Sequence, residues 1–561
     1  MSFDNFNTRP TIFFLRLLSV SVPFFLCHSG FAIEIDNLKQ LRDSVGLTQV
    51  KTKPSALSNI RIAVLDNGFS GFTAGNGELP DCTKIIQGPG IAEKLTPHGL
   101  LMAKTLWNMT GQTDPSICAP EITLVNAHGY TNLVAAIDWV IENQIDIVVY
   151  AINWEYGGNF DGKGFINKEV NRAIDAGVMW INAAGDYQGL VYEDQISVGS
   201  NFGLEFTPEN NRGRKKDTIR FKNNLDNNDI KVVLSWNDFS ESESYATTDD
   251  LDIKIYDGDG NEVASGERIQ SGSQDESDES ENYSQHAREI VFLRNAKRDE
   301  YFITIDQMSS TIMASKFRIT LVPDTYGSME WLDKRVKGQV MIPADNPKVI
   351  AVGDTSPVSA SGATSDGRLK PDILMPISRV EFSDGTKPFG TSFGAAIFGG
   401  IAAVMKSIDY SLTQEKLIEH LAHLKVSSRE SSTGALQITA FNEVQSALGI
   451  TRLAFINSET TQFAKIQHPI TGQMIYYALI DSEPNVVEPF IRLPGVGLTN
   501  SSTHVYLMNR FRNLYDFRGN DSRYGAEYLR ILNINSVQIT NPNKKDGVPV
   551  WSTPRGGIIR R

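Results

Sequence analysis

The chain has 561 residues, too many for one compact domain, so its length predicts roughly two to four folded units. Its 41% apolar and 21% charged residues are ordinary for a globular protein and exclude neither an enzyme nor a binding protein. A net charge of -13, with no stripe of clustered Lys and Arg, argues against a nucleic-acid-binding protein.

The N-terminus has the pattern of a secretory signal peptide. Arg9 and Arg16 precede an apolar run over 17–27, and small residues follow near Ala32. This run is shorter than the ~20 residues that cross a bilayer, and no later segment is comparable, so we expect no membrane span. The expectation is a signal peptide over 1–32, a linker over 33–57, and a secreted or periplasmic protein.

Two cysteines remain after that segment, Cys82 and Cys118, on either side of His98. In an oxidising compartment they could form a disulfide that restrains the loop carrying the histidine. They could equally remain two unpaired buried thiols. Whether their Cβ atoms approach closely enough for a bond does not follow from the sequence, so both alternatives stay open.

Short β-branched runs alternate with segments of helical apolar spacing between residues 60 and 199. Such alternation predicts a parallel sheet covered by helices on both faces. The expected strands cover 60–65, 122–126, 145–153 and 178–183, and the expected helices cover 100–107, 133–142 and 168–176.

From about residue 202 the pattern changes to short strands separated by polar turns, which is typical of an all-β sandwich. The expected strands there cover 232–236, 251–256, 290–293, 301–305 and 317–322, with a mobile acidic and serine-rich loop over 271–284. Strand and helix alternation returns at 349–352 and in the glycine- and alanine-rich helix after Ser392. We therefore expect one α/β domain, built from 58–201 and 331–449, that is interrupted by a β-sandwich over 202–330 and followed by a β-rich accessory domain over 450–561.

The run Asp257-Gly258-Asp259-Gly260-Asn261 clusters oxygen atoms of the kind that calcium binds. The later glutamate of a helix-loop calcium motif is missing, and such runs are common in turns between strands, so we favour a turn. We expect no required cofactor. Calcium at this run remains an alternative, and the metal content is unknown.

Three segments could supply a nucleophilic serine with a base and with an acid that orients the base. Asp66 ends an apolar strand before a glycine turn, which puts its carboxylate at the carboxyl edge of the sheet, where ligand sites form. His98 opens a helix, and Gly99 removes bulk that would crowd a substrate. Ser392 begins a helix whose amides and dipole favour nearby negative charge.

Each of these residues also has an ordinary structural interpretation: Asp66 as a turn residue, His98 as a helix cap, and Ser392 as an N-cap. Together, in this order and at these positions, the three segments resemble the signature segments of the subtilisin-like serine proteases. The resemblance implies a subtilisin-like domain with Asp66, His98 and Ser392 as its catalytic triad. It covers about residues 58–200 and 335–445.

Further segments carry the same resemblance. Residues 152–158 resemble the family strand that pairs with the substrate backbone, which implies that an extended peptide is bound around Glu155, Tyr156 and Gly157. Residues 342–353 and 365–372 are similar to the family segment before the serine. The unit over 202–330 resembles the jelly-roll-like β domains of secreted bacterial proteases, because of its segments 234–238 and 250–257.

The chain departs from the family at Asp186, where the family supplies an asparagine as one oxyanion donor. An ionised Asp186 would repel the oxyanion, and the loss of one such donor costs about 10²–10³ in rate. A protonated Asp186 could donate, if burial raises its pKa. We therefore expect a narrower substrate range, a lower pH optimum or slower turnover. A second departure, Ala396 in place of the usual proline, should alter packing only.

The leading hypothesis is an exported serine endopeptidase that acts on a protein or peptide and forms an acyl-enzyme on Ser392. The alternative is a catalytically silent subtilisin-like scaffold that binds proteins or peptides, which Asp186 and the two β-rich units favour. An esterase with the same triad is the weaker third candidate, since a small ester would not need the peptide-pairing segment. Cleavage specificity and oligomeric state do not follow from the sequence.

Overall fold

The computed structural model describes residues 54–209, 214–270, 283–333, 338–375, 390–408 and 410–418. It also describes Leu41, Arg42, Leu47 and Arg212, and short strands between 436 and 552. The signal peptide expected over 1–32 and most of the acidic loop expected over 271–284 lie outside the described residues.

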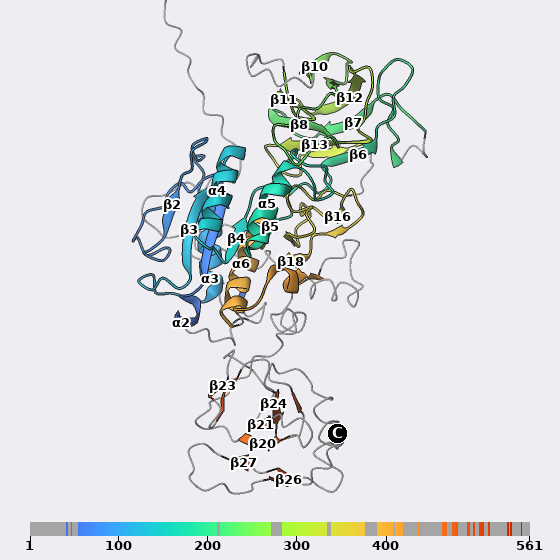
Figure 1. The fold of residues 1–561 in the computed structure, drawn as a ribbon. Coiled ribbons are helices and arrows are strands. Elements are labelled where there is room, and N and C mark those ends of the chain that lie inside the picture. Colours follow the sequence, from blue (N-terminus) through green and yellow to red (C-terminus); the bar gives the residue numbers. More distant parts are fainter. Residues whose placement is uncertain are drawn as a thin grey trace, which may run out of the picture.

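Eight parallel strands form the central sheet, in the order β19-β18-β15-β5-β4-β1-β3-β2 (Figure 1). The expected parallel sheet is therefore present, and all four strands expected between residues 60 and 183 belong to it. The strands are β1 Arg61–Asp66, β2 Lys84–Ile86, β3 Glu121–Asn126, β4 Ile147–Tyr150, β5 Met179–Ala183, β15 Ile350–Asp354, β18 Ile373–Met375 and β19 Leu436–Gln437.

Helices cover both faces of this sheet. Successive side chains of a strand point to opposite faces, so Ile62 and Val64 of β1 pack into one core while Ala63 and Leu65 pack into the other. The first core contains α3 (His98–Thr110) and α6 (Thr391–Ile408), and the second contains α4 (Tyr130–Glu142) and α5 (Phe165–Asp175). No helix in the described part of the chain has the length and apolar character needed to cross a membrane.

Small residues let α6 lie very close to its neighbours. A Cβ atom on Gly400 would lie 2.4 Å from Cβ of Met109 in α3, and one on Gly399 would lie 2.4 Å from Cγ2 of Val149 in β4. Ala396, in the position of the family's proline, is fully buried in the same core. The glycines and alanines of α6 are therefore needed for its packing against α3 and the sheet.

The segment expected as a linker over 33–57 packs against the α/β domain where it is described. Leu41, Leu47 and Leu57 are fully buried in the core with α3 and α6, and the last belongs to the short helix α2 (Pro54–Leu57). The guanidinium group of Arg42 donates to the carbonyl oxygens of Asn108 (3.5 Å) and Met109. A cation at the carboxyl end of α3 also complements the helix dipole. These residues are therefore part of the domain, because they bury apolar surface that a linker would expose.

Residues 191–331 contain two antiparallel sheets, in the orders β10-β9-β12-β7-β14 and β11-β8-β13-β6 (green and yellow in Figure 1). The strands are β6 Val191–Gln195, β7 Ile219–Asn223, β8 Asn228–Trp236, β9 Leu251–Tyr256, β10 Glu262–Gly266, β11 Arg288–Ala296, β12 Asp299–Gln307, β13 Lys316–Pro323 and β14 Met329–Trp331. Their first strand lies before residue 202, where the sequence pattern placed the change. Glu193 of β6 is charged and yet nearly buried, because Arg318 of β13 donates to its carboxylate at 2.6 Å. A charged residue at a buried position breaks the apolar pattern by which a strand is recognised, so β6 was not predicted.

Side chains of both antiparallel sheets belong to the same hydrophobic core as the α4 and α5 face of the parallel sheet. Tyr192 of β6 packs against Trp331 of β14, with ring centroids 5.5 Å apart, and so joins the two sheets. Phe165 of α5 packs against Phe239, with ring centroids 6.1 Å apart, and so joins the two antiparallel sheets to the α/β domain. We call residues 191–331 the β unit.

The run over 257–261 forms the turn between β9 and β10, as favoured from the sequence. Oδ1 of Asp257 accepts hydrogen bonds from the backbone of Asp259 (3.0 Å) and Asn261 (2.8 Å), and Gly260 has a positive φ of 83°. These contacts explain the residue types by turn geometry. Among the described residues, no group of three or more His, Cys, Asp or Glu side chains could hold a metal ion.

Further short strands pair outside these sheets. Nine of them lie in the described parts of the segment over 450–561, and the rest of that segment lies outside the described residues. They are β20 Phe463–Gln467, β21 Met474–Ile480, β22 Ile491–Leu493, β23 Gly497–Thr499, β24 His504–Asn509, β25 Leu514–Tyr515, β26 Ser536–Val537, β27 Ile539–Thr540 and β28 Trp551–Ser552, and the hairpin β16 Gly362–Ala363 with β17 Leu369–Lys370 lies earlier in the chain.

Cys82 and Cys118 are joined by a disulfide, with their Cα atoms 6.0 Å apart. Cys82 precedes β2 and Cys118 precedes β3, its parallel neighbour, so the bridge ties the amino ends of two strands. His98 follows the carboxyl end of β2. The bridge therefore does not restrain the loop of the histidine directly, contrary to the role that the sequence position indicated.

We predict that the double substitution Cys82→Ser with Cys118→Ser lowers the free energy of unfolding by about 2–4 kcal/mol, because the bridge closes a loop of 36 residues. Urea unfolding followed by tryptophan fluorescence measures this loss. Wild-type protein unfolded in the presence of a reductant is the matched control and should behave like the double variant. Equal stability of the oxidised protein and the variant would contradict the prediction.

Candidate active site

The site lies where the strand order changes direction. From β1 the chain first adds β3 and β2 on one side and then adds β4 and β5 on the other. Loops that follow neighbouring strands diverge at such a point and leave room for a ligand at the carboxyl edge of the sheet. Asp66 is the last residue of β1 and lies at this point.

Asp66 and His98 form a direct pair. Oδ2 of Asp66 lies 2.7 Å from Nδ1 of His98, and Oδ1 accepts the backbone N–H of Asn67 at 2.8 Å. Asp66 is 1% exposed, whereas the His98 side chain is 38% exposed. Since a carboxylate only accepts, Nδ1 carries a proton, which leaves Nε2 of neutral His98 as a proton acceptor.

The charges around His98 favour its protonated form. Desolvation of the ring lowers the pKa of His98, but the charge and hydrogen bond of Asp66, with a smaller contribution from Asp186, outweigh it and raise this pKa above 6.5. An imidazole of this kind is poised to accept a proton and to hold it while the carboxylate balances the charge. The geometry of this pair is therefore suited to an orienting acid and a general base.

Gly99 permits this pair to form, for a reason that differs from the one expected. A Cβ atom on Gly99 would lie 2.4 Å from the Phe69 ring and 2.5 Å from Cβ of Asp66. The backbone N–H of Gly99 also donates to the carbonyl oxygen of Gly68 at 2.9 Å. Glycine is thus needed so that α3 can start against the end of β1, and not to make room for a substrate.

Ser392 is the second residue of α6 and lies over the end of β4. Its hydroxyl donates to the carbonyl oxygen of Ala151, the residue after β4, at 3.2 Å. No hydrogen bond between described residues joins Ser392 to His98. In the absence of substrate such contacts are often long, and they tighten in the complex. The structure thus places all three residues at one edge of the sheet, with the pair formed and the serine turned aside.

Asp186 lies at the amino end of α6, next to Ser392. Its Oδ1 accepts the backbone N–H of Thr391 at 2.8 Å, and a Cβ atom on Gly390 would lie 2.4 Å from its Oδ2. Burial raises the pKa of Asp186 to about 6, although the hydrogen bonds of Thr391 and the charge of His98 lower it. Asp186 is therefore ionised at neutral pH and protonated in mild acid.

The segment expected to bind substrate is in contact with the β unit. Glu155 is 8% exposed, and its Oε1 accepts hydrogen bonds from Nζ of Lys231 (2.8 Å) and the hydroxyl of Tyr187 (3.1 Å). The guanidinium group of Arg288 lies 3.7 Å from the ring centre of Tyr156. Gly157 has a positive φ of 95° and receives a hydrogen bond from Ile166 at its carbonyl oxygen.

Sequence reasoning missed Lys231, Arg288 and Tyr187 as parts of this region. Lys231 lies in β8 and Arg288 in β11, more than 70 residues beyond Glu155 in the chain. Their positions follow only from the docking of the β unit, for which no local pattern gives a signal. Tyr187, which directly follows Asp186, was the one of the three that its neighbour could have indicated.

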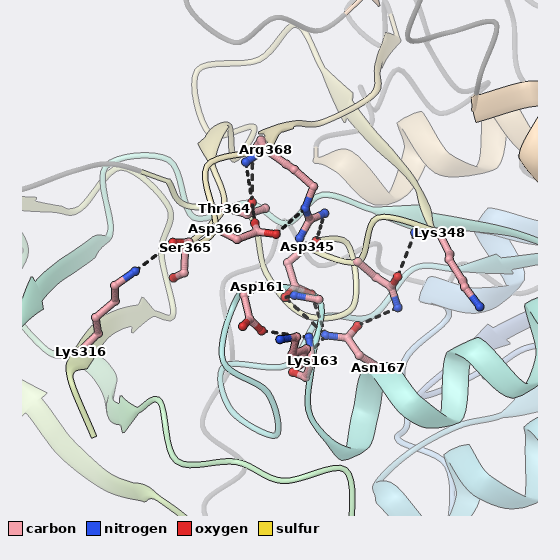
Figure 2. Close-up of polar contacts among 12 residues, drawn as sticks. Asp161, Lys163, Asn167, Lys316, Asp345, Lys348, Thr364, Ser365, Asp366 and Arg368 are labelled. Atoms are coloured by element: carbon pink, nitrogen blue, oxygen red, sulfur yellow. Dashed lines mark hydrogen bonds and ion pairs between the residues drawn. The ribbon is translucent and has the colours of Figure 1, made fainter. Parts of the chain in front are cut away.

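A polar network around the buried Asp345 joins segments that are far apart in the chain (Figure 2). The carboxylate of Asp345 accepts hydrogen bonds from the backbone N–H of Gly162 (2.8 Å) and the side-chain amide of Asn167 (3.1 Å). The guanidinium group of Arg368 donates to the backbone carbonyl oxygen of Asp345 at 2.7 Å. Burial raises the pKa of Asp345 to about 6. The network joins the loop before α5 to the segments 342–347 and 364–370.

No protein-family model matches the chain, and no curated protein matches it. Among solved structures, the chain is similar to the CspB protease of Clostridium perfringens, with 13% identity and a TM-score of 0.44 over 73% of this chain and 97% of that one. It is also similar to MycP1 of Mycobacterium smegmatis, with 12% identity and a TM-score of 0.31 over 75% of this chain and 86% of that one. A third similar structure is the psychrophilic subtilisin-like protease Apa1 of Pseudoalteromonas sp. AS-11, with 11% identity and a TM-score of 0.27 over 71% of this chain and 93% of that one. All these TM-scores are below 0.5, so we base the function on the geometry of the site.

We predict that Asp66→Asn lowers the pKa of His98 below 6.5, because desolvation of the ring remains while the charge of its partner is lost. Histidine-selective NMR titration, with His98→Gln to assign the signal, measures this pKa in both proteins. In the wild type the raised pKa stabilises the fold fully below pH 6.5, and this contribution is lost as the pH rises through the folded pKa. Asp66→Asn should therefore lose more stability at pH 5.5 than at pH 9. A wild-type pKa at or below 6.5 would contradict the account.

Proposed function

We propose that this chain is an exported serine endopeptidase of the subtilisin-like type, which hydrolyses protein or peptide substrates through an acyl-enzyme on Ser392. The observation that supports it most is the 2.7 Å contact between Asp66 and His98 at the point where the strand order changes direction. Ser392, the second residue of α6, lies at the same edge of the sheet. An acid, a base and a nucleophile are the groups that acyl transfer requires.

In the proposed reaction Ser392 first leaves the carbonyl oxygen of Ala151 and turns towards His98. Its oxygen attacks the scissile carbonyl carbon while His98 takes the hydroxyl proton, and the negative charge of Asp66 stabilises the imidazolium ion. The tetrahedral intermediate then expels the amine, which receives that proton from His98, and leaves an ester on Ser392. Water, activated by His98 in the same way, hydrolyses the ester and restores the serine.

The oxyanion would form at the amino end of α6, where the helix dipole favours negative charge. Asp186 sets a condition on this step, since it can donate a hydrogen bond only when protonated. Its pKa of about 6 lies below the raised pKa of His98, which must be neutral to act as a base. Protonated Asp186 together with neutral His98 is therefore a minor population at every pH, so we expect slow turnover with an optimum between the pKa values of the two residues.

The alternative is the catalytically silent binding scaffold. Two observations favour it: Asp186 already accepts the backbone N–H of Thr391, and the Ser392 hydroxyl is turned towards Ala151. The retained contact between Asp66 and His98 favours the peptidase, because a binding scaffold has no need of an oriented base.

Export is part of the proposal. The N-terminal pattern of basic residues, an apolar run and small residues supports it, as does the disulfide between Cys82 and Cys118, which an oxidising compartment would preserve. The proposed location is secreted or periplasmic.

A serine-reactive fluorophosphonate tests the proposal on the exported protein across pH 4–9. We predict that labelling of the wild type is greatest between the pKa values of Asp186 and His98 and declines at high pH, and that Ser392→Ala is not labelled. Asp186→Asn should remove the decline at high pH and raise the labelling rate at pH 8 by about 10²-fold, because the amide donates at every pH. If the folded wild type and Asp186→Asn are both unlabelled at every pH, the peptidase proposal fails and the binding scaffold is supported.

A further inference from the structure

Two segments lie on either side of Ser392. The first follows β4, and its Ala151 accepts the Ser392 hydrogen bond. The second follows β5, and its Gly185 donates to the Thr391 hydroxyl at 3.0 Å. Because β4 and β5 are neighbouring parallel strands, these segments run along the two sides of the serine. In the proposed reaction the substrate residue that supplies the scissile carbonyl binds beside Ser392, so these two segments are the nearest parts of the protein to its side chain.

A hydrogen bond joins the two segments beyond the serine. The hydroxyl of Tyr187, from the second segment, donates to Oε1 of Glu155 in the first at 3.1 Å. Burial, and then the charge of Glu155, raises the pKa of Tyr187, so this hydroxyl stays a donor. A Cβ atom on Gly185 would lie 2.9 Å from the Tyr187 ring and 3.2 Å from Cγ of Met341, which is fully buried. Side chains of the protein itself therefore occupy this region.

The charge of Glu155 is also already compensated. Nζ of Lys231, from β8 of the β unit, lies 2.8 Å from the same Oε1 that binds Tyr187. A free carboxylate here would attract a lysine or arginine side chain of the substrate. A carboxylate that is 8% exposed and paired with Lys231 offers little to such a side chain.

We propose that the bridge between Tyr187 and Glu155 excludes large side chains, and that Lys231 removes the attraction for basic ones, so that the peptidase cleaves after Gly, Ala or Ser. This inference rests on the proposed function. A large side chain would have to separate Tyr187 from Glu155 and leave a nearly buried carboxylate with one partner fewer. Differences of about 10–200-fold are ordinary for such discrimination in a binding site.

Peptide diphenyl phosphonates test the inference directly, with alanine, phenylalanine or lysine side chains next to the phosphorus. In this reaction the Ser392 oxygen forms a bond to phosphorus, and a phenoxide leaves and takes up the serine proton to become phenol. Intact-protein mass spectrometry measures the rate. We predict that the alanine probe labels the wild type at least about 50-fold faster than the other two. A phenylalanine or lysine probe that reacts as fast as the alanine probe overturns the inference.

Variants test the two parts separately. Tyr187→Ala should raise the phenylalanine-to-alanine rate ratio about tenfold, and Lys231→Met should raise the lysine-to-alanine ratio by a similar factor. Tyr245→Ala is the matched control, since this tyrosine contacts Asp238 in the β unit, and it should keep the wild-type ratios. Ratios in Tyr187→Ala and Lys231→Met that equal those of the control overturn the inference.

The fluorophosphonate separates this inference from the proposed function, because it carries no side chain. If it labels Ser392 while all three phosphonates react equally, the peptidase proposal stands and the inference fails. If it labels nothing, the peptidase proposal fails and the inference falls with it.

Discussion

The packing of α6 against α3 is the contact on which the rest of the site depends. Gly399 and Gly400 bring α6 so close to Val149 and Met109 that no larger residue would fit without moving backbone or core side chains. Each helix carries one candidate catalytic residue at its amino end, His98 on α3 and Ser392 on α6. Because both helices lie on the same face of a parallel sheet, their amino ends meet the carboxyl edge where β1 ends in Asp66. A core-packing constraint thus sets the spacing of residues that are hundreds of positions apart in the chain.

The β unit forms part of the surroundings of the site. Its Lys231 pairs with Glu155 and its Arg288 covers the ring of Tyr156, so the segment expected to bind substrate is held by residues from another sheet. Two hydrogen bonds of 3.0 Å between Phe239 and Asn159 fix the start of the loop that leads from Asn159 to α5. Through these contacts the β unit holds the segment expected to bind substrate in place.

The sequence predicted those features that local pattern controls. Strands such as 60–65 and 251–256 were predicted because apolar β-branched runs between turn residues have few alternatives. Asp66 and His98 were predicted because their segments, together with that of Ser392, resemble the signature segments of the subtilisin-like serine proteases. The partners of Glu155 were not predicted, because they come from β8 and from the loop after β5. The strand β6 was missed because Glu193 is buried only by virtue of Arg318, and the burial of Leu41 and Leu47 depends on α3 and α6. Contacts between distant segments decided each of these cases.

Cleavage of a protein substrate tests the central claim most directly, namely that the oriented base and the serine break peptide bonds. The exported protein and its Ser392→Ala variant would each be incubated with an unfolded protein at pH 5–8, and new N-termini would be identified by mass spectrometry. The account predicts new termini with the wild type alone, most abundant between the pKa values of Asp186 and His98, where neutral His98 and protonated Asp186 coexist most often. Folded wild-type protein that produces no termini beyond those of Ser392→Ala at any pH would contradict it.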